Sequence, residues 1–195
     1  RPLDPDLIVE NAIYKISRNY ESIPNLMTAF YRETIRKNRS YVSIGEAAVE
    51  VFKAPYANDM RFDAARLYKG RKSTDVARMD TVLFKLQGGI SNTLDLDIVK
   101  NTELILTIDA MKSYDYSLTS VIEIDGRPHY VINFIQKPNV DIPLFVGTLF
   151  IEVESGAISE AEFGLNLSDK AAATSIFVRK KPIGMEVTPE LVTYR

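Results

Sequence analysis

The stretch VGTLFIEVESGAISEAEFGL, residues Val146 to Leu165, decides the fold, because apolar and polar residues alternate along two runs of it. Side chains alternate between the two faces of a β-strand, so this period of two predicts two strands with one buried face each. The runs meet at Glu154-Ser155-Gly156, which predicts the turn of an antiparallel hairpin. The side chains expected to face one another on the buried side are Leu149, Ile151, Val153, Ala161, Phe163 and Leu165.

Four glutamates of this hairpin invite a catalytic interpretation, because glycoside hydrolases act with two carboxyl groups. They alternate with apolar residues, however, and the alternation predicts that they lie on a hydrated outer face. The four are Glu152, Glu154, Glu160 and Glu162. We therefore expect the hairpin to form one wall of a sheet.

Alternating runs elsewhere in the chain predict more strands, to a total of about eight to nine. The dipeptide Asp125-Gly126 is a two-residue hairpin signal between two of them. Besides the opening pair, the predicted strands are Leu26 to Lys37, Ser40 to Lys53, Arg66 to Lys69, Tyr114 to Ile124, Pro128 to Lys137, Thr174 to Lys180 and Met185 to Arg195.

Helices are predicted at the start of the chain and in its middle. The segment Leu3 to Tyr20 has Asp4 as a cap, Pro5 in the first turn and a stripe of apolar residues at helical spacing. Asp80 to Gln87 is predicted as a helix, whereas Ser91 to Lys100 is compatible with a strand or with a helix, which we favour. The stripe of the first helix is Leu7, Ile8, Ala12, Ile13, Ile16 and Tyr20.

The fold class expected from these elements is α+β. We expect residues 1–195 to form a single half-barrel-like domain, excised from a longer protein because the chain opens on Arg1-Pro2. Its core would be a large curved antiparallel sheet. The N-terminal helix and one or two inserted helices would lie on the concave side of that sheet.

Ser43, Gly45 and Ala47 form a stripe of small side chains on one face of a predicted strand. Two explanations fit this stripe. A helix packs closely against it, which is the favoured explanation, or the three residues line a cavity in the concave face of the sheet. They are the only candidate binding residues that the sequence offers.

The composition excludes several classes of function. The 195 residues include 24 Lys and Arg and 26 Asp and Glu, a net charge of −2, so we expect no nucleic-acid binding and no electrostatic docking on an anionic membrane. The absence of cysteine removes disulfides and thiol chemistry. No apolar run approaches the roughly 20 residues of a membrane-spanning helix, so we expect no membrane span in this chain.

His129 is the only histidine, and we expect it on an exposed strand face, without a catalytic role. No G-x-S-x-G motif accompanies it, and a zinc site needs more His or Cys ligands than the chain has. Asp95 and Asp97 lie two apart, which a hydrated face explains. The sequence therefore predicts no catalytic residues, no metal ligands and no cofactor.

Several motifs resemble those of a family of secreted bacterial proteins. They are KLQGG (Lys85 to Gly89), DIVKN (Asp97 to Asn101), IDGRPHYVINF (Ile124 to Phe134), GTLFIEVESGAISEAEFGLNLS (Gly147 to Ser168) and VRKKPIG (Val178 to Gly184). The family is that of the carboxypeptidase-like regulatory-domain-containing proteins, in which a transthyretin-like β-sandwich precedes a region of this kind. The name describes that sandwich, so the resemblance implies no peptidase activity. It does imply a periplasmic or outer-membrane-associated location.

The hairpin pattern G-x-L-x-I-x-x-x-x-G-x-I, which begins at Gly147, is also similar to that of Lol-type lipoprotein carriers. Those proteins fold as open half-barrels that hold acyl chains on the concave face. The two resemblances imply a non-catalytic envelope domain that binds an apolar ligand, such as a lipid, or a segment of an envelope protein partner. The alternative is a structural or interaction module of an outer-membrane-associated protein, and a hydrolase that uses His129 with nearby carboxylates is less favoured.

Overall fold

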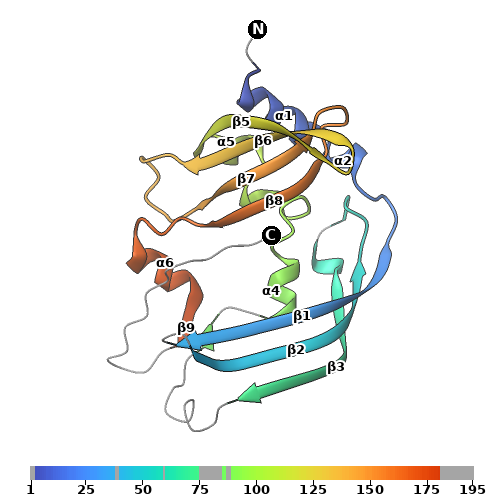
Figure 1. The fold of residues 1–195 in the computed structure, drawn as a ribbon, viewed down its shortest axis with the longest axis vertical. Helices are drawn as coiled ribbons and strands as arrows, with labels where there is room; N and C mark the ends of the chain where they lie inside the picture. The colour runs from blue at the N-terminus through green and yellow to red at the C-terminus, as the bar shows by residue number, and fades with distance from the viewer. Residues whose placement is uncertain (1–2, 38–39, 59, 75–84, 87–88, 181–195) are drawn as a thin grey trace. The chain divides into compact units, whose positions relative to one another are not determined.

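The computed structural model describes residues 3–37, 40–58, 60–74, 85–86 and 89–180. The chain divides into two compact units, which are described separately below (Figure 1). Of the described residues, the first unit comprises 3–21 and 98–174. The second comprises those between 22 and 97 together with 175–180.

The first unit contains a four-stranded antiparallel meander in which each strand pairs with the next along the chain. Its strands are β5 (Tyr114–Ile124), β6 (Arg127–Gln136), β7 (Phe145–Glu152) and β8 (Ile158–Leu165). The predicted hairpin over residues 146–165 is confirmed as β7 and β8. A second predicted hairpin joins β5 to β6, and its two turn residues adopt the left-handed backbone conformation that such a turn requires, with φ values of 50° and 75°.

The buried face of the β7–β8 hairpin follows the predicted alternation. Leu149 and Ile151 are 0% and 1% exposed, and Leu149 pairs directly with Ala161. Val153 was also expected on this face, but it lies beyond the end of β7 and is 37% exposed. The alternation thus gave the correct face but not the end of the strand.

The first helix, α1 (Pro5–Tyr14), begins as predicted, with the Asp4 carboxylate accepting the Asp6 backbone N–H at 3.0 Å. Val9 and Ala12 are its buried residues, and α1 lies against β5. Leu7 was expected in the buried stripe, but it is exposed. After Lys15 the chain continues as the one-turn helix α2 (Ile16–Asn19).

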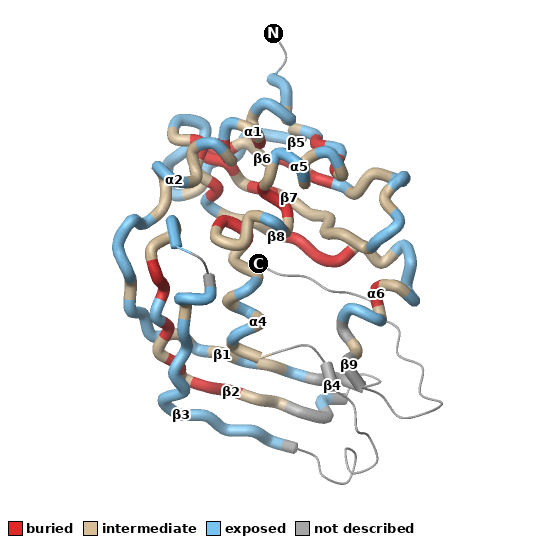
Figure 2. The backbone as a smooth tube through the Cα atoms, turned by 180° about the vertical axis from the view of Figure 1, so that it is seen from behind, coloured by how far each residue is buried: buried red, intermediate tan, exposed pale blue. Residues whose placement is uncertain are grey.

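The core of the first unit is formed by large side chains from its strands and from the segment that precedes β5. Figure 2 colours the buried residues of the sheet red. That segment contains η2 (Thr102–Leu104) and α5 (Ile108–Met111). At the edge-on contact between Tyr114 and Phe134, the ring centroids are 5.5 Å apart. The side chains of this unit that are less than 2% exposed include Val9, Ile105, Leu106, Tyr114, Ile132, Phe134, Leu149 and Ile151.

The second unit contains a three-stranded antiparallel sheet in the order β1-β2-β3. The strands β4 and β9 pair with each other and form a separate two-stranded sheet. The three long strands are β1 (Asn25–Lys37), β2 (Ser40–Lys53) and β3 (Ala64–Thr74). The shorter elements are η1 (Met60–Phe62), β4 (Lys85–Leu86), α4 (Ile90–Leu94) and β9 (Val178–Lys180).

Two predicted elements of this part of the chain are wrong in whole or in part. The expected strand Thr174 to Lys180 is correct only for its last three residues, which form β9. Its first four end the helix α6 (Lys170–Phe177), because the Asp169 carboxylate accepts the Ala172 N–H at 2.9 Å and so caps a helix rich in alanine. Lys85 and Leu86, expected in a helix, form β4. The rest of that expected helix and the expected strand Met185 to Arg195 lie outside the described residues.

The α+β class with antiparallel sheets is confirmed, but the expected single large sheet is not. Within the described ranges, the strands hydrogen-bond in groups of three, two and four. Alternation along a strand specifies which face is buried and leaves its neighbours undefined, so the sequence could not show this division. That residues 1–195 form one half-barrel-like domain stays a prediction. None of the described helices is long and apolar enough to span a membrane.

Candidate functional site

The small-residue stripe on β2 meets a helix at one of its three members. Ala47 is buried with Val49 and Val51, and Ile90 and Leu94 of α4 pack against this cluster. This is the close helix packing favoured from the sequence. Gly45 is partly buried, and a Cβ placed on it would meet no atom within 4 Å. The side chain of Ser43 lies outside the described part of the chain, so a cavity lined by all three residues stays a prediction.

The opposite face of the same sheet, here called the outer face, carries large exposed apolar side chains. Leu26 and Phe52 are direct cross-strand neighbours and are 72% and 40% exposed. Phe30, four residues along β1, is 65% exposed, and the Arg32 guanidinium lies 5.4 Å from its ring centroid. The sequence contained a signal for this face that the prediction did not use, because β1 has apolar residues at both odd and even positions.

Charged rows cross the outer face between its apolar side chains. The Glu46 carboxylate accepts a hydrogen bond from the Arg32 Nε at 2.8 Å and another from Arg71. The hydrogen bonds from these two guanidinium groups, Arg71 first, hold the pKa of Glu46 below its usual value. Glu50 pairs in the same way with Arg66 of β3. These pairs join facing residues and so support the register of the three strands.

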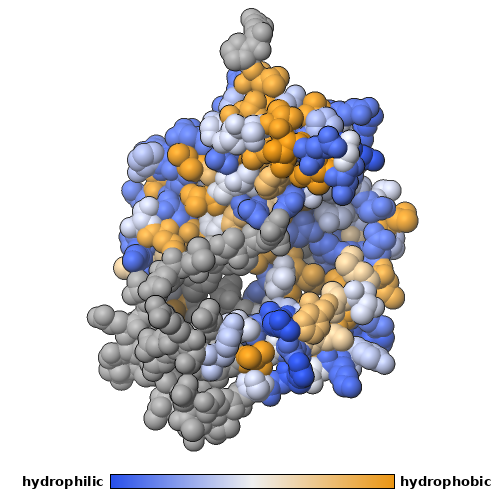
Figure 3. Space-filling model, viewed as in Figure 1, coloured by the Kyte–Doolittle hydropathy of each residue, from blue (hydrophilic) through white to orange (hydrophobic). Residues whose placement is uncertain are grey.

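A second exposed apolar surface lies in the first unit. Hydrophobic residues gather over α1 and β5 in the view of Figure 3. Leu3 and Leu7 are 52% and 60% exposed there, and Val121 and Ile122 of β5 are also exposed. These exposed apolar residues lie outside the outer face, so they offer a control surface for it.

Lys53, at the end of β2, forms the centre of a buried charged network in the second unit. Its Nζ lies 2.9 Å from Asp63 Oδ2 and 2.6 Å from Asp97 Oδ2, and the three side chains are 10%, 3% and 22% exposed. Tyr56 donates its hydroxyl hydrogen to Asp97 at 3.0 Å. Burial lowers the pKa of Lys53, but the hydrogen bonds to the two carboxylates raise it by more, so the pKa lies above its usual value. The amine is therefore a cation and not a nucleophile, and Asp97 is not the hydrated residue expected.

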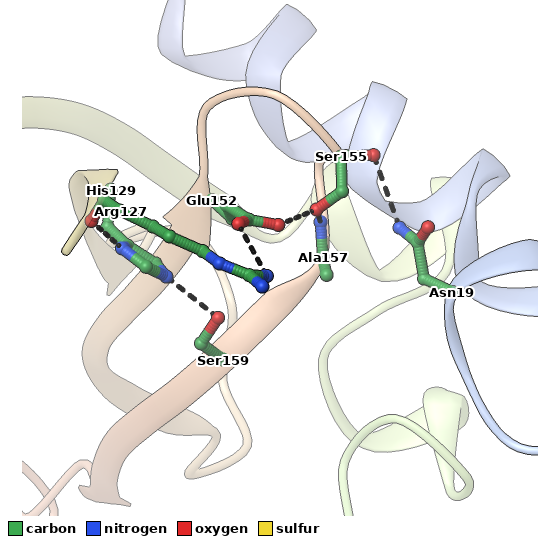
Figure 4. Close-up of polar contacts among 7 residues, drawn as sticks. All are labelled: Asn19, Arg127, His129, Glu152, Ser155, Ala157 and Ser159. Atoms are coloured by element: carbon green, nitrogen blue, oxygen red, sulfur yellow. Dashed lines mark hydrogen bonds and ion pairs between the residues drawn. The ribbon is translucent and has the colours of Figure 1, made fainter. Parts of the chain in front are cut away.

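His129 is 2% exposed, which contradicts the exposed position expected from the sequence. Its Nδ1 lies 2.8 Å from the Arg127 carbonyl oxygen and its Nε2 lies 2.8 Å from Ser159 Oγ (Figure 4). A carbonyl only accepts, so Nδ1–H donates to it, and in the neutral ring Nε2 then accepts from the serine hydroxyl. Ser159 is the extra residue of a bulge in β8, and bulges redirect side chains.

The contact between His129 and Ser159 has the distance of a base and its nucleophile, but its surroundings differ from a catalytic triad. In a triad, a carboxylate orients the imidazole. Here a backbone carbonyl takes that place, and Glu152, the direct neighbour of His129 on β7, bonds to Arg127 and Ser155 instead. The arrangement satisfies a buried imidazole and supports a structural role for it.

Glu152 is 8% exposed, so the prediction of a hydrated position is wrong for this glutamate. Its neighbour Glu154 is exposed as expected. Glu152 accepts hydrogen bonds from the Ser155 hydroxyl and from Arg127 Nη1, the latter at 3.1 Å. Ser155 first and Arg127 second hold the pKa of Glu152 below 4.5, against the opposing effect of burial. The turn of the hairpin thus depends on an ionised carboxylate.

Replacing Glu152 by glutamine is expected to make the stability less sensitive to acid. A depressed folded-state pKa adds stability above the unfolded value near 4.5, and this stability is lost as the pH falls through the folded value. Urea unfolding at steps from pH 7 to pH 3 measures it. The parent should lose more stability than Glu152→Gln over this range, and Glu154→Gln should follow the parent. Parallel curves for parent and Glu152→Gln would contradict the assignment.

Tyr20 ties the end of α2 to the edge strand β8. Its hydroxyl donates to the Ile158 carbonyl oxygen at 2.8 Å and accepts the Ile158 N–H at 2.9 Å. Asn19 supports the same hairpin through a 3.3 Å bond from its Nδ2 to the Ser155 carbonyl. One side chain thereby satisfies both backbone groups of an edge residue, in place of a neighbouring strand.

Replacing Tyr20 by phenylalanine is expected to lower the free energy of unfolding by about 1–3 kcal/mol, because two backbone groups lose their partner while the ring stays in place. Chemical denaturation followed by circular dichroism measures the change. The control is Tyr14→Phe, since Tyr14 is 68% exposed and should tolerate the loss of its hydroxyl. Equal effects of the two substitutions would show that the bonds to Ile158 add no stability.

A metal centre finds no support in the described residues, among which no group of three or more His, Asp or Glu side chains could hold an ion. The described part of the chain offers two kinds of site. One is the buried polar network, of which there is one around His129 and Glu152 in the first unit and one around Lys53 in the second. The other is the exposed outer face of the second unit, with its apolar and charged rows.

No family model and no curated protein matches the chain. Among solved structures, it is similar to MucB, with 16% identity and a TM-score of 0.36 over 83% of this chain and 52% of MucB. For MucB in complex with MucA(peri), the values are 16% and 0.30, over 80% of this chain and 47% of that one.

A DUF1329 family protein from Desulfovibrio piger is similar over 87% of this chain and 76% of its own, with 11% identity and a TM-score of 0.30. The chain spans about half the length of MucB.

Proposed function

We propose that this chain is a non-catalytic domain of the bacterial envelope that binds a segment of a partner protein on the outer face of its three-stranded sheet. The envelope location follows from the resemblance to the secreted carboxypeptidase-like regulatory-domain-containing family. The observation that carries the proposal is the exposure of Leu26, Phe30 and Phe52 on one sheet face. Large exposed apolar side chains among charged ones are typical of protein interaction sites.

A protein partner is favoured over a lipid by the packing of the two sheets. The inner side chains of the first unit's sheet, such as Ile132 and Leu149, are 0% exposed and are covered by protein. In the second unit, α4 packs on the inner face beside Ala47. The exposed apolar groups lie between ion pairs of the outer face, and a peptide segment can match such a mixture of groups better than an acyl chain.

Site-specific photo-cross-linking tests this proposal. The full-length protein, carrying a photoreactive residue at position 30, is irradiated in envelope fractions, and a protein adduct is expected. The adduct should disappear in the variant Leu26→Ser/Phe52→Ser and persist in Leu7→Ser, which removes an equally exposed apolar group from the first unit. Loss of the adduct in both variants, or in neither, would count against the outer face.

Two other occupants of the outer face give different results in the same experiment. A second copy of the chain would give an adduct of twice its mass, and sedimentation would show a dimer. A bound lipid would appear in native mass spectra and would give no protein adduct. Either result would replace the proposed partner segment.

A further inference from the structure

We infer that the partner that covers the outer face also carries an acidic, extended segment, which binds by adding a strand to β3; this inference rests on the proposed function. In the described structure β3 pairs with β2 on one side only, so it forms an edge of the sheet. Every residue from Ala64 to Ser73 is exposed, as the tube in Figure 2 shows along β3. The outward N–H and C=O groups of such an edge can pair with an added strand.

The edge strands of the two sheets, β8 and β3, differ in how their outer edges are covered. In the first unit, the edge strand β8 is met at Ile158 by the hydroxyl of Tyr20, which bonds to both backbone groups. The corresponding edge of β3 instead presents two large apolar side chains, Leu67 and Tyr68, which are 61% and 77% exposed. Tyr68 is the extra residue of a bulge between the pairs of Leu67 and Lys69 with β2.

The charge of β3 selects the partner. The strand contains four cations and no acidic residue. Only two glutamates of β2 face it, and the guanidinium groups of Arg66 and Arg71 remain 77% and 84% exposed despite their ion pairs. The four cations are Arg66, Lys69, Arg71 and Lys72.

These cations repel a second copy of β3, because like charges would then face each other across the new pair. Lysines and bulges on an edge are a common protection against pairing with similar strands. An acidic strand meets the opposite situation, since its carboxylates gain attraction from the same groups. The edge of β3 therefore disfavours pairing with a second copy of β3 and favours pairing with an acidic segment.

The register predicts the pattern that such a segment should have. Arg66, Lys69 and Arg71 face Glu50, Ala48 and Glu46 on the outer face, whereas Leu67 faces Val49 on the opposite side. An added strand with carboxylates at alternate positions would bring them to these three cations, whereas Lys72 faces Gly45 on the side of Leu67. Its other side chains, if apolar, would lie on the side of Leu67.

Fluorescence anisotropy with a labelled peptide of five Val-Glu repeats tests the inference on the full chain. The peptide should bind, and the affinity should fall at least tenfold in Lys69→Glu/Lys72→Glu. The same double charge reversal in the first unit, Lys112→Glu/Lys170→Glu, should leave the affinity unchanged. A peptide of Val-Lys repeats, and the Val-Glu peptide N-methylated at every second residue to block strand pairing, should bind at least tenfold more weakly.

Equal binding of the acidic peptide to the parent and to Lys69→Glu/Lys72→Glu would overturn the inference, as would equal binding of the Val-Lys peptide or no binding of any peptide. The position-30 adduct separates this outcome from failure of the proposed function. An adduct that persists in Lys69→Glu/Lys72→Glu retains the partner on the outer face and removes β3 as its site. Peptide binding at β3 without the adduct would support strand addition at β3 and refute partner binding on the outer face.

Discussion

Replacing Lys53 by alanine is expected to lower the free energy of unfolding by about 3–5 kcal/mol, the cost of breaking a buried ion pair from one side. The substitution leaves Asp63, whose side chain is 3% exposed, without the ammonium group at 2.9 Å. It also removes the contact between Nζ and the ring of Tyr56, whose centroid is 5.5 Å away. Denaturant unfolding of the full chain, followed by circular dichroism, measures the loss.

The control for Lys53→Ala is an exposed ion pair. Lys112 lies 2.6 Å from Asp109, and the two side chains are 74% and 89% exposed. Exposed pairs add little because water solvates both partners after the contact is lost. Lys112→Ala should therefore unfold with the parent, within the error of the measurement. An equally small effect of Lys53→Ala would mean that water solvates the network of Lys53, Asp63 and Asp97. The network would then not stabilise the end of β2.

A double substitution separates the ion pair from the packing of the lysine stem. In the background of Lys53→Ala, replacing Asp63 by asparagine removes the buried negative charge that has lost its ammonium group. We expect this second change to recover part of the lost stability, whereas Asp63→Asn alone should destabilise the parent. Additive effects of the two substitutions would contradict a direct interaction.

Replacing Gly147 by alanine is expected to cost about 3 kcal/mol, at the upper end of the usual cost of overpacking. A Cβ at this position would lie 2.1 Å from the Glu162 carbonyl oxygen and 2.6 Å from the Phe163 Cα. Both are backbone atoms of β8, so no side-chain movement relieves the clash. Gly147 also lies directly opposite Phe163, whose ring packs edge-on against Phe145 with centroids 5.4 Å apart.

The matched control is Gly45→Ala on β2, where an added Cβ meets no atom within 4 Å. A glycine inside a strand costs about 0.5–1 kcal/mol relative to alanine, so this variant should be neutral or slightly more stable. The two variants add the same methyl group, against the backbone of β8 at position 147 and into open space at position 45. Equal thermal stability of Gly147→Ala and Gly45→Ala would contradict the close approach of β7 and β8.

Local patterns predicted much of the fold. The strand Ser40 to Lys53 has the observed bounds of β2, and Tyr114 to Ile124 has those of β5. Where the prediction failed, a distant or capping contact decided the outcome. The helix α6 replaced the first part of an expected strand because Asp169 caps its first turn.

The candidate site was less predictable than the fold. The stripe of Ser43, Gly45 and Ala47 pointed to the inner face of β2, where Ala47 packs with α4. The exposed residues of the outer face lie on the other side, and their exposure depends on what the rest of the chain leaves uncovered. The burial of His129 likewise depends on Ser159, which reaches it from another strand.

The sequence alone determined the positions of most strands, the buried face of the β7–β8 hairpin and the left-handed turn between β5 and β6. Each of these follows from neighbouring residues, through alternation or the freedom of glycine. Only the tertiary structure decided how the strands divide among sheets, which charges are buried and which edge stays open. These depend on groups far apart in the chain, such as Lys53 and Asp97, whose meeting no local pattern encodes.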